Sequence, residues 1–361
     1  MIKPLALAVT AFAAGPAALL AHPPGSDGDH VHWDDLPRPQ KQADEITFAP
    51  TAMPDRVVLT YANDPATTQS VTWRTEASDR EPFAQIALAT RGPQFVSSED
   101  RMLANQELVS TVRGTTTEYK TTLSTAHFHT VEFTGLKPTT KYVYRVGDGT
   151  NWSEWSQFTT ASDKPEPFSF IYVGDAQNEV FSLWSRVIRQ AYSDAPKAAF
   201  TLHAGDLINR AENDDEWGGW FDAGGFINRS TPVLATPGNH EYPRDHKGVS
   251  NHWRPTFAFP ENGPDLPGLE ETVWYLDYQG VRFISLNSNE QQAEQVPWLR
   301  ETLRTNPQRW TVVTFHHPLY NSKAGRDNPE LRAAWQPVFD EFGVDLVLQG
   351  HDHTYARSKL V

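Results

Sequence analysis

The segment at residues 236–241 constrains this chain more than any other stretch. Its sequence, TPGNHE, directly follows a short apolar run at residues 232–235, which predicts the end of a buried parallel strand. Residues 239–241 then supply an amide oxygen, an imidazole and a carboxylate, and we expect Gly238 to let the backbone turn so that all three point the same way. Alone, a Gly-Asn-His triplet is weak evidence for a site.

Four more segments place oxygen or nitrogen ligands directly after a predicted strand. They are GDAQ (174–177), GDLIN (205–209), HHP (316–318) and GHDH (350–353). Loops at the carboxyl ends of parallel strands meet along one rim of the sheet, so we expect these polar residues to gather there. Carboxylates and imidazoles without thiolates suit iron, manganese or zinc, and the residue types do not select among them. The donors are enough for two ions if Asp206 is shared, and they are Asp175, Asp206, Asn239, His316, His351 and His353.

Strands and helices alternate through the C-terminal part of the chain. Predicted strands cover residues 168–173, 198–203, 232–235, 310–315 and 346–349, and predicted helices cover 180–192, 212–228, 290–304 and 330–342. A hairpin is predicted from 273–277 and 282–286 around Gln279-Gly280, after a long loop at 242–271. This alternation predicts a mostly parallel sheet in a layered α/β domain over residues 162–361.

The preceding part of the chain has a different period. Seven short segments alternate apolar and polar residues between Asn-Asp, Pro and Gly turns, which predicts an all-β sandwich over residues 47–161. The segments are 56–61, 70–75, 85–90, 115–123, 130–133, 142–146 and 157–159. A polar, proline-containing linker at 163–167 separates the two patterns.

The N-terminus has the pattern of a secretory signal peptide. A short basic start, a small apolar stretch and Ala21 before a polar segment predict a signal peptide at residues 1–21, with an uncleaved anchor as the alternative. Residues 22–46 are rich in Pro, Gly, Asp and His and predict a flexible leader. We therefore expect a secreted or periplasmic protein that does not bind the membrane once the signal peptide is removed.

Charge and cysteine content limit the chemistry. The formal net charge is −14, which argues against binding nucleic acid or an anionic membrane and means that an anionic substrate needs a strong local cation. The chain has no cysteine, so disulfides, zinc–thiolate sites and thiol nucleophiles are excluded. Oligomeric state cannot be inferred from these features.

The five ordered segments resemble the motifs of the metallophosphoesterase (calcineurin-like) superfamily. The sandwich ahead of them is similar to the purple acid phosphatase branch. Within the sandwich, the segment 135–144 resembles the tyrosine corner of a fibronectin type III domain, with Tyr142 as the corner and Trp73 in the core. The WSEWS segment at 152–156 resembles an element of cytokine-receptor modules, and we expect it to serve packing.

This resemblance implies ligand and catalytic roles. One ion would be held by Asp175, Asp206 and His353, and a second by Asp206, Asn239, His316 and His351. The ions, divalent or trivalent Fe, Zn or Mn, would bind a shared hydroxide that attacks phosphorus directly. His240 would protonate the leaving alkoxide or stabilise the transition state. The implied activity is that of an acid phosphatase acting on a small phosphate monoester.

Three features depart from the family pattern. The purple enzymes have a tyrosine at the position of Asn209. We therefore expect a colourless protein whose metal site is less selective for iron. Gln177 stands where other members of the superfamily have a histidine ligand, so its role as a ligand is open. Members usually continue past the last motif with further strands, whereas this sequence ends eight residues after His353, so it is either a minimal domain or a fragment, and we expect a fragment.

Other interpretations remain open at this stage. An aspartate after a strand often only caps the next helix, although two such aspartates followed by three histidine-bearing motifs favour a metal site. His317 is expected to be a loop residue and His203 a core residue rather than ligands. A phosphodiesterase or nucleotide pyrophosphatase would use the same ions, with a pocket set by the 242–271 loop. An inactive, truncated binding protein is the alternative of another class.

Overall fold

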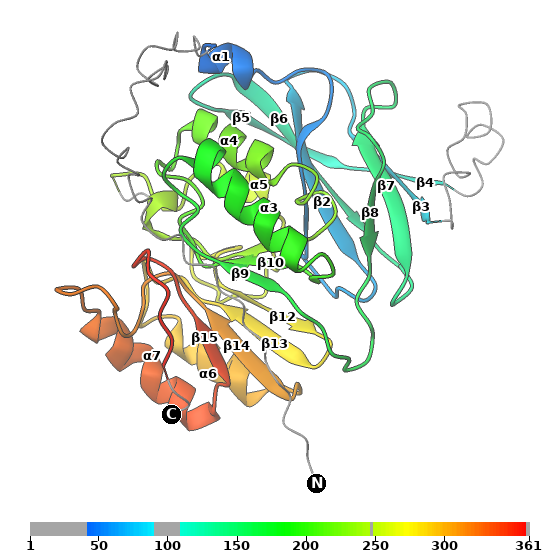
Figure 1. Cartoon of the computed structure of the whole chain (residues 1–361). Coiled ribbons are helices and arrows are strands. Elements are labelled where there is room, and N and C mark those ends of the chain that lie inside the picture. Colours follow the sequence, from blue (N-terminus) through cyan, green and yellow to red (C-terminus); the bar gives the residue numbers. More distant parts are fainter. Residues whose placement is uncertain (1–41, 90–108, 246–247, 359–361) are drawn as a thin grey trace, which may run out of the picture.

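The computed structural model describes residues 42–89, 109–245 and 248–358. It consists of a β-sandwich followed by a layered α/β region, as the sequence predicts (Figure 1). The predicted signal peptide and most of the predicted leader lie outside the described residues. At the described end of the leader, Asp44–Thr47 form one helical turn, α1, rather than a flexible segment.

The sandwich contains eight strands in two antiparallel sheets, ordered β1-β2-β6-β5 and β4-β3-β7-β8. Their bounds are β1 (Asp55–Thr60), β2 (Gln69–Glu76), β3 (Phe83–Leu88), β4 (Ser110–Arg113), β5 (Thr115–Lys120), β6 (Thr125–Phe133), β7 (Lys141–Gly147) and β8 (Ser156–Thr159). All seven predicted segments correspond to strands. The eighth, β4, is a short and mostly exposed edge strand, so it lacks the apolar alternation that would reveal it.

Two expected features of the sandwich are present. The Tyr142 hydroxyl accepts the backbone N–H of Lys137 at 2.8 Å, which is the geometry of a tyrosine corner, and Trp73 is buried in the core. The Arg145 guanidinium lies 4.4 Å from the ring centre of Trp152 and 4.9 Å from that of Trp155. The two tryptophans therefore pack around an arginine on the sandwich. Kinship with fibronectin type III domains stays a prediction.

The α/β region has two sheets, where the sequence pattern predicts one. Three parallel strands form the first, in the order β11-β10-β9, and the second is ordered β12-β13-β14-β15 with only β12 antiparallel. The bounds are β9 (Ile171–Val173), β10 (Thr201–His203), β11 (Val233–Ala235), β12 (Trp274–Tyr278), β13 (Val281–Ser285), β14 (Trp310–Thr314) and β15 (Leu346–Leu348). Gln279 and Gly280 have φ of 44° and 92° and form the predicted tight turn between β12 and β13.

Alternation of side chains along β13 explains why the sheets stack. Phe283 packs into the core that includes residues of both sheets, whereas Ile284 packs with residues of the C-terminal helices. Strands buried on both faces read as continuous apolar runs, so the sequence does not tell whether the second face meets helices or another sheet. Figure 1 shows α3 and α4 beside β9 and β10, and α6 and α7 on the side of β13–β15.

The four predicted helical segments are all present; the second and third are shorter than predicted, and the first and last extend slightly beyond the predicted range. The helices of this region are α3 (Ser185–Asp194), preceded by a π-helical turn η4 (Val180–Trp184), then α4 (Asp214–Gly224), a 3₁₀ turn η5 (Asn239–Glu241), α5 (Trp253–Thr256), α6 (Val296–Arg304) and α7 (Pro329–Phe342). The α4 helix ends where Gly225 takes a φ of 51°. None of the described helices is long and apolar enough to cross a membrane.

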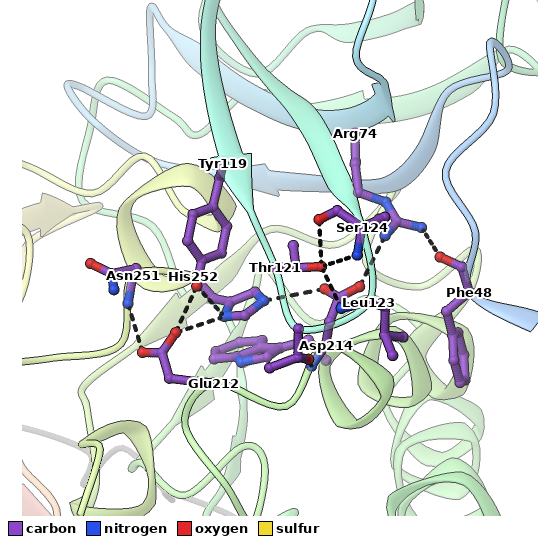
Figure 2. Close-up of polar contacts among 12 residues, drawn as sticks. Phe48, Arg74, Tyr119, Thr121, Leu123, Ser124, Glu212, Asp214, Asn251 and His252 are labelled. Atoms are coloured by element: carbon purple, nitrogen blue, oxygen red, sulfur yellow. Dashed lines mark hydrogen bonds and ion pairs between the residues drawn. The ribbon is translucent and has the colours of Figure 1, made fainter. Parts of the chain in front are cut away.

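The sandwich is docked on the α/β region through both apolar and ionic contacts. Val58 and Tyr61 belong to the same buried cluster as Trp217 and Phe257. A buried polar network crosses the same junction (Figure 2). In it, Asp214 at the start of α4 bonds with Arg56 and Arg74 of the sandwich and with His252, while Tyr119 donates to Glu212.

Candidate metal centre

Loops at the carboxyl ends of strands in both sheets deliver the candidate ligands to one place. Asp175 follows β9, Asp206 follows β10 and Asn239 follows β11, so the first sheet contributes two carboxylates and an amide. From the second sheet, His316 follows β14, and His351 and His353 follow β15. The predicted convergence is therefore found, with the rim formed by two stacked sheets instead of one.

His316 lies at the centre of the cluster. Its Nδ1–H donates to the carbonyl of Ala204 at 2.8 Å, which leaves Nε2 as the nitrogen that faces the other candidates. Nε2 is 3.1 Å from Asp206 Oδ2, 3.1 Å from Asn239 Oδ1 and 3.1 Å from His351 Nδ1. A backbone carbonyl on the far nitrogen is the usual support of a metal-ligating histidine.

The donor set fits a bound cation. Two oxygens and a second imidazole nitrogen surround His316 Nε2, and a proton on that nitrogen can bond well with only one of them. Ligand atoms that share an ion about 2.1 Å away lie about 3 Å apart, as these do. Burial opposes the charged form of His316, but Asp206 outweighs burial and raises the pKa of His316 to about 9. The site thus attracts positive charge.

Asp175, Gln177 and His353 form the other side of the cluster. His353 Nε2 lies 3.5 Å from Asp175 Oδ1, and an oxygen of Asp175, an oxygen of Asp206 and a nitrogen of His316 lie within 4.8 Å of one another. Gln177 directs its amide nitrogen to Asp206 Oδ2 at 3.3 Å and to His353 Nε2 at 2.9 Å. Its carbonyl oxygen is buried with no hydrogen-bond partner among the described residues, so an unsatisfied acceptor lies next to the cluster.

The two carboxylates have different electrostatic environments. Burial and the nearby Asp206 raise the pKa of Asp175, although His316 opposes this shift. Burial also acts to raise the pKa of Asp206, but His316 lowers it overall. For His351, burial and the charge of His316 lower the pKa to about 4, so its nitrogen lone pair is available to a ligand.

Four candidate ligands have left-handed backbone conformations. The φ values are 54° at Asp175, 54° at Asp206, 78° at His351 and 51° at His353. Such conformations are unfavourable for residues other than glycine and accumulate at functional sites, where the surroundings enforce them. Nothing in the residue pattern signals them, because the sequence contains no glycine at these positions.

Glu241 differs from the expectation that it points with Asn239 and His240. Its carboxylate is fully buried and accepts the backbone N–H groups of Asp206, Leu207 and Gly238 at 2.7–2.8 Å. Burial raises the pKa of Glu241 to about 7, and the charge of Asp206 acts in the same direction. Glu241 therefore braces the loop that carries Asp206 instead of joining the cluster.

Gly238 is needed for close approach and not for a left-handed turn. Its φ is −92°, which any residue can adopt. A Cβ at this position would lie 2.1 Å from Asp206 Oδ1 and 2.5 Å from Asp206 N. The absence of a side chain at position 238 thus lets the loops after β10 and β11 touch.

His240 lies beside the cluster with a defined orientation. Its Nδ1–H donates to the backbone carbonyl of Asn209 at 2.6 Å, and its Nε2 lies 3.9 Å from Asp206 Oδ2. About a third of the side chain is exposed. The backbone N–H of Asn209 donates to Glu216 at 2.7 Å, so Asn209 contributes a positioned carbonyl.

The two histidines expected to serve other roles have different surroundings. His203 is buried, with ring centres 5.5 Å from both Trp184 and Trp220, and it is not among the clustered ligand atoms. His317 is closer: one ligand atom each of His316, His317 and His351 lie within 4.8 Å of one another. His317 Nδ1 also lies 2.9 Å from Ser288 Oγ. The expected role of His317 as a loop residue stays a prediction.

A cleft of about 520 Å³ lies beside the cluster. It is lined by Asn239, Tyr242, Ser288, Asn289, Glu290, Gln292, His317, Asp327, Asn328, Pro329, Glu330 and Leu331. Among the described residues of the 242–271 loop, which the sequence suggests as the wall of the pocket, Tyr242 alone lines the cleft. Asn239 and His317 border the candidate ligands, and the remaining lining residues follow β13 or lie around the start of α7, two segments that sequence reasoning missed.

Comparison with known proteins agrees with this arrangement. The family model for the purple acid phosphatase N-terminal domain matches residues 54–160, and the model for calcineurin-like phosphoesterases matches residues 168–355. Purple acid phosphatase 1 of Ipomoea batatas is 29% identical over 269 residues, which cover 69% of this chain and 55% of that protein. An uncharacterized protein of Mycobacterium tuberculosis is 28% identical over 345 residues, covering 83% of this chain and 61% of that protein.

A solved structure shares the fold. The purple acid phosphatase from yellow lupin (Lupinus luteus) seeds aligns with a TM-score of 0.67 at 18% identity, covering 84% of this chain and 59% of that one. The chain thus spans about three fifths of the length of these relatives. The structural likeness shows the fold.

Proposed function

The chain belongs to the calcineurin-like phosphoesterase family, and on that premise we propose that it is a metal-dependent phosphoric monoester hydrolase of the acid phosphatase type. The observation that carries this proposal is the cluster around His316 Nε2, where Asp206, Asn239 and His351 each place a ligand atom 3.1 Å away. Three such atoms from three separate loops have no structural need to converge, but a bound cation requires it.

The proposed ligand sets are those that the family resemblance implies. One ion would be held by Asp175, Asp206 and His353, and the other by Asp206, Asn239, His316 and His351. Two bound ions, of Fe, Zn or Mn, would supply an activated water molecule as nucleophile and neutralise charge on the phosphoryl group. Support comes from the shared position of Asp206, which lies in reach of His316 and is grouped with Asp175. Asn209 at the position of the family's tyrosine still predicts a colourless protein.

His240 would act as the proton donor to the leaving group. Because its Nδ1–H is engaged by the carbonyl of Asn209, any second proton sits on Nε2, the nitrogen on the side of Asp206. Partial exposure of the ring leaves room for a substrate oxygen next to Nε2. A positioned histidine of this kind contributes roughly 10²- to 10⁴-fold to a rate.

Phosphodiester hydrolysis is the second candidate, since the same ions serve both reactions. The cleft beside Asn239 has a volume of about 520 Å³, which is room for a second ester group. This volume supports the diesterase as a second candidate. The two candidates are distinguished by comparing hydrolysis of phenyl phosphate with hydrolysis of its bis-ester, diphenyl phosphate, by the protein loaded with Zn, Mn or Fe. We expect the monoester to be hydrolysed with the higher kcat/KM, and a clear preference for the bis-ester would contradict the monoesterase assignment.

An inactive binding protein is the alternative from another class. It predicts that purified protein retains no stoichiometric metal after dialysis and hydrolyses neither ester. The clustered donor set argues against it. A location outside the cytoplasm is likewise proposed here, and its support is the signal-peptide pattern of residues 1–21.

A further inference from the structure

We infer that the cleft beside the metal centre selects phosphate esters whose alcohol carries a protonated primary amine, as in an amino-alcohol phosphate. This inference rests on the proposed function and names the substrate class of that same site. The cleft reaches the candidate ligand Asn239, so a phosphoryl group at the cluster would place its leaving group between Tyr242, Glu290 and the start of α7. Its volume of about 520 Å³ is within the usual range for small-molecule sites.

The charges along the cleft are negative. Three carboxylates line it, Glu290, Asp327 and Glu330, and no lysine or arginine is among the described lining residues. Asp327 is neutralised by Arg332, whose Nη1 lies 2.6 Å from Asp327 Oδ1. Among the described residues, the side chain of Glu290 accepts only the neutral hydroxyl of Tyr242 at 2.7 Å, and Glu330 is exposed. Two carboxylates thus remain to attract a cationic leaving group and repel an anionic one.

Three of the amides that line the cleft each donate a side-chain N–H to a backbone carbonyl. Asn289 donates its side-chain N–H to the carbonyl of Pro237 at 3.0 Å, Gln292 donates to Ser288 at 2.7 Å, and Asn328 donates to Pro318 at 2.8 Å. Their side-chain oxygens retain free acceptor capacity, as an amide oxygen has two lone pairs.

This combination identifies the chemistry of the occupant. A lining of carboxylates and amide oxygens offers acceptors, so it pairs best with a group that has several N–H donors and a positive charge. A primary ammonium has both properties. A quaternary ammonium lacks the donors, a sugar lacks the charge, and a carboxylate is repelled.

The test uses three esters of similar size and the metal-loaded full chain. They are phosphoethanolamine, n-propyl phosphate and phosphoglycolate, whose leaving groups are cationic, neutral and anionic. We expect kcat/KM to fall in that order, by about tenfold or more between the first and the last. The reason is that two carboxylates attract a positive leaving group and repel a negative one. Equal values, or a preference for phosphoglycolate, would overturn the inference.

Matched variants assign the effect to the cleft. Glu330→Gln and Glu290→Gln should each reduce the ratio of kcat/KM for phosphoethanolamine over n-propyl phosphate several-fold. Glu294→Gln makes the same change of charge on an exposed residue outside the cleft and should leave the ratio as it is. A ratio that stays constant in both cleft variants would contradict the assignment.

A binding readout separates this inference from the proposed function. Binding of millimolar ethanolamine, n-propanol or glycolate to the full chain is measured by saturation-transfer NMR. We expect a binding signal for ethanolamine alone, and a weaker one in Glu330→Gln. Such binding without hydrolysis of phenyl phosphate would remove the phosphatase proposal and keep the cleft assignment. Hydrolysis of phenyl phosphate without any preference for the amine in rate or in binding would remove the cleft assignment alone.

Discussion

Arg56 and Asp214 form a two-point ion pair between the sandwich and the α/β region. Arg56 Nη1 lies 2.6 Å from Asp214 Oδ1, and Arg56 Nη2 lies 3.0 Å from Asp214 Oδ2. Both side chains are almost completely buried, and Arg74 and His252 complete the surroundings of the carboxylate. The partners hold the pKa of Asp214 well below its usual range despite burial, so the carboxylate is charged at all working pH values.

Removal of the Asp214 charge should destabilise the whole molecule. Asp214→Asn leaves Arg56 and Arg74 buried without their shared counter-ion, and breaking a buried pair from one side costs about 3–5 kcal/mol. The free energy of unfolding from urea titration measures this loss. Asp215→Asn at the next position, outside the ion pair, should change it by less than 1 kcal/mol or so. Equal effects of the two variants would contradict a structural role for the ion pair.

His203 should make the protein less stable in acid. Burial lowers the pKa of His203 to about 3, whereas an unfolded histidine titrates near 6.5. Below pH 6.5 this histidine is protonated in the unfolded chain but stays neutral in the folded protein. The free energy of unfolding therefore falls as the pH drops toward 3. The contribution amounts to roughly 3 kcal/mol at pH 4.

The difference between wild type and His203→Gln isolates this effect. Unfolding free energies measured from pH 7 to pH 4 should fall more steeply in wild type than in the variant, because the variant has no group to protonate at this position. Parallel pH profiles for the two proteins would show that His203 is not held in its neutral form.

Glu241 should control metal affinity without binding metal. Its carboxylate accepts three backbone N–H groups, including that of Asp206, so Glu241→Gln replaces one acceptor oxygen with a donor and disturbs the loop. Loss of such a supporting residue typically lowers metal affinity 10- to 100-fold. Competition with a chromogenic chelator measures this affinity. Unchanged affinity, with Glu294→Gln as the control for charge, would contradict the bracing role.

His240→Ala should slow hydrolysis in a way that depends on the leaving group. We expect a loss of roughly 10²- to 10⁴-fold for alkyl esters, whose alkoxides need a proton. The loss should be smaller for 4-nitrophenyl phosphate, whose phenolate leaves without one. Values of kcat for the two esters measure the difference. An equal loss for both would show that His240 does not donate the proton.

Part of this arrangement can be inferred from sequence because it depends on local order. Strands that bury both faces predict the α/β region, and polar residues directly after them predict a common rim, where Asp175, Asp206 and His316 do meet. Whether those residues hold two ions stays a prediction. The bracing role of Glu241 is difficult to recognise from sequence. A glutamate next to Asn-His looks the same in sequence whether its carboxylate binds a metal ion or backbone N–H groups.

Features that depend on long-range packing could not be inferred. The stacking of two sheets is one such feature, because apolar runs such as residues 310–315 do not specify whether helices or a second sheet cover each face. The left-handed φ values of 54° at Asp206 and 78° at His351 occur at residues other than glycine, so the residue types do not signal them. Most of the cleft wall comes from residues within 288–292 and 327–331, two segments without a chemical motif.

Metal stoichiometry in Asp206→Asn tests the central claim most directly. Asp206 is the only ligand proposed for both ions, so its loss should affect both sites, while the fold, measured by circular dichroism, stays largely intact. Elemental analysis after dialysis should find about two ions per wild-type chain, markedly fewer in the variant, and no turnover of phenyl phosphate by the variant. A variant that keeps the wild-type metal content and a near wild-type rate would contradict a dinuclear centre built around Asp206.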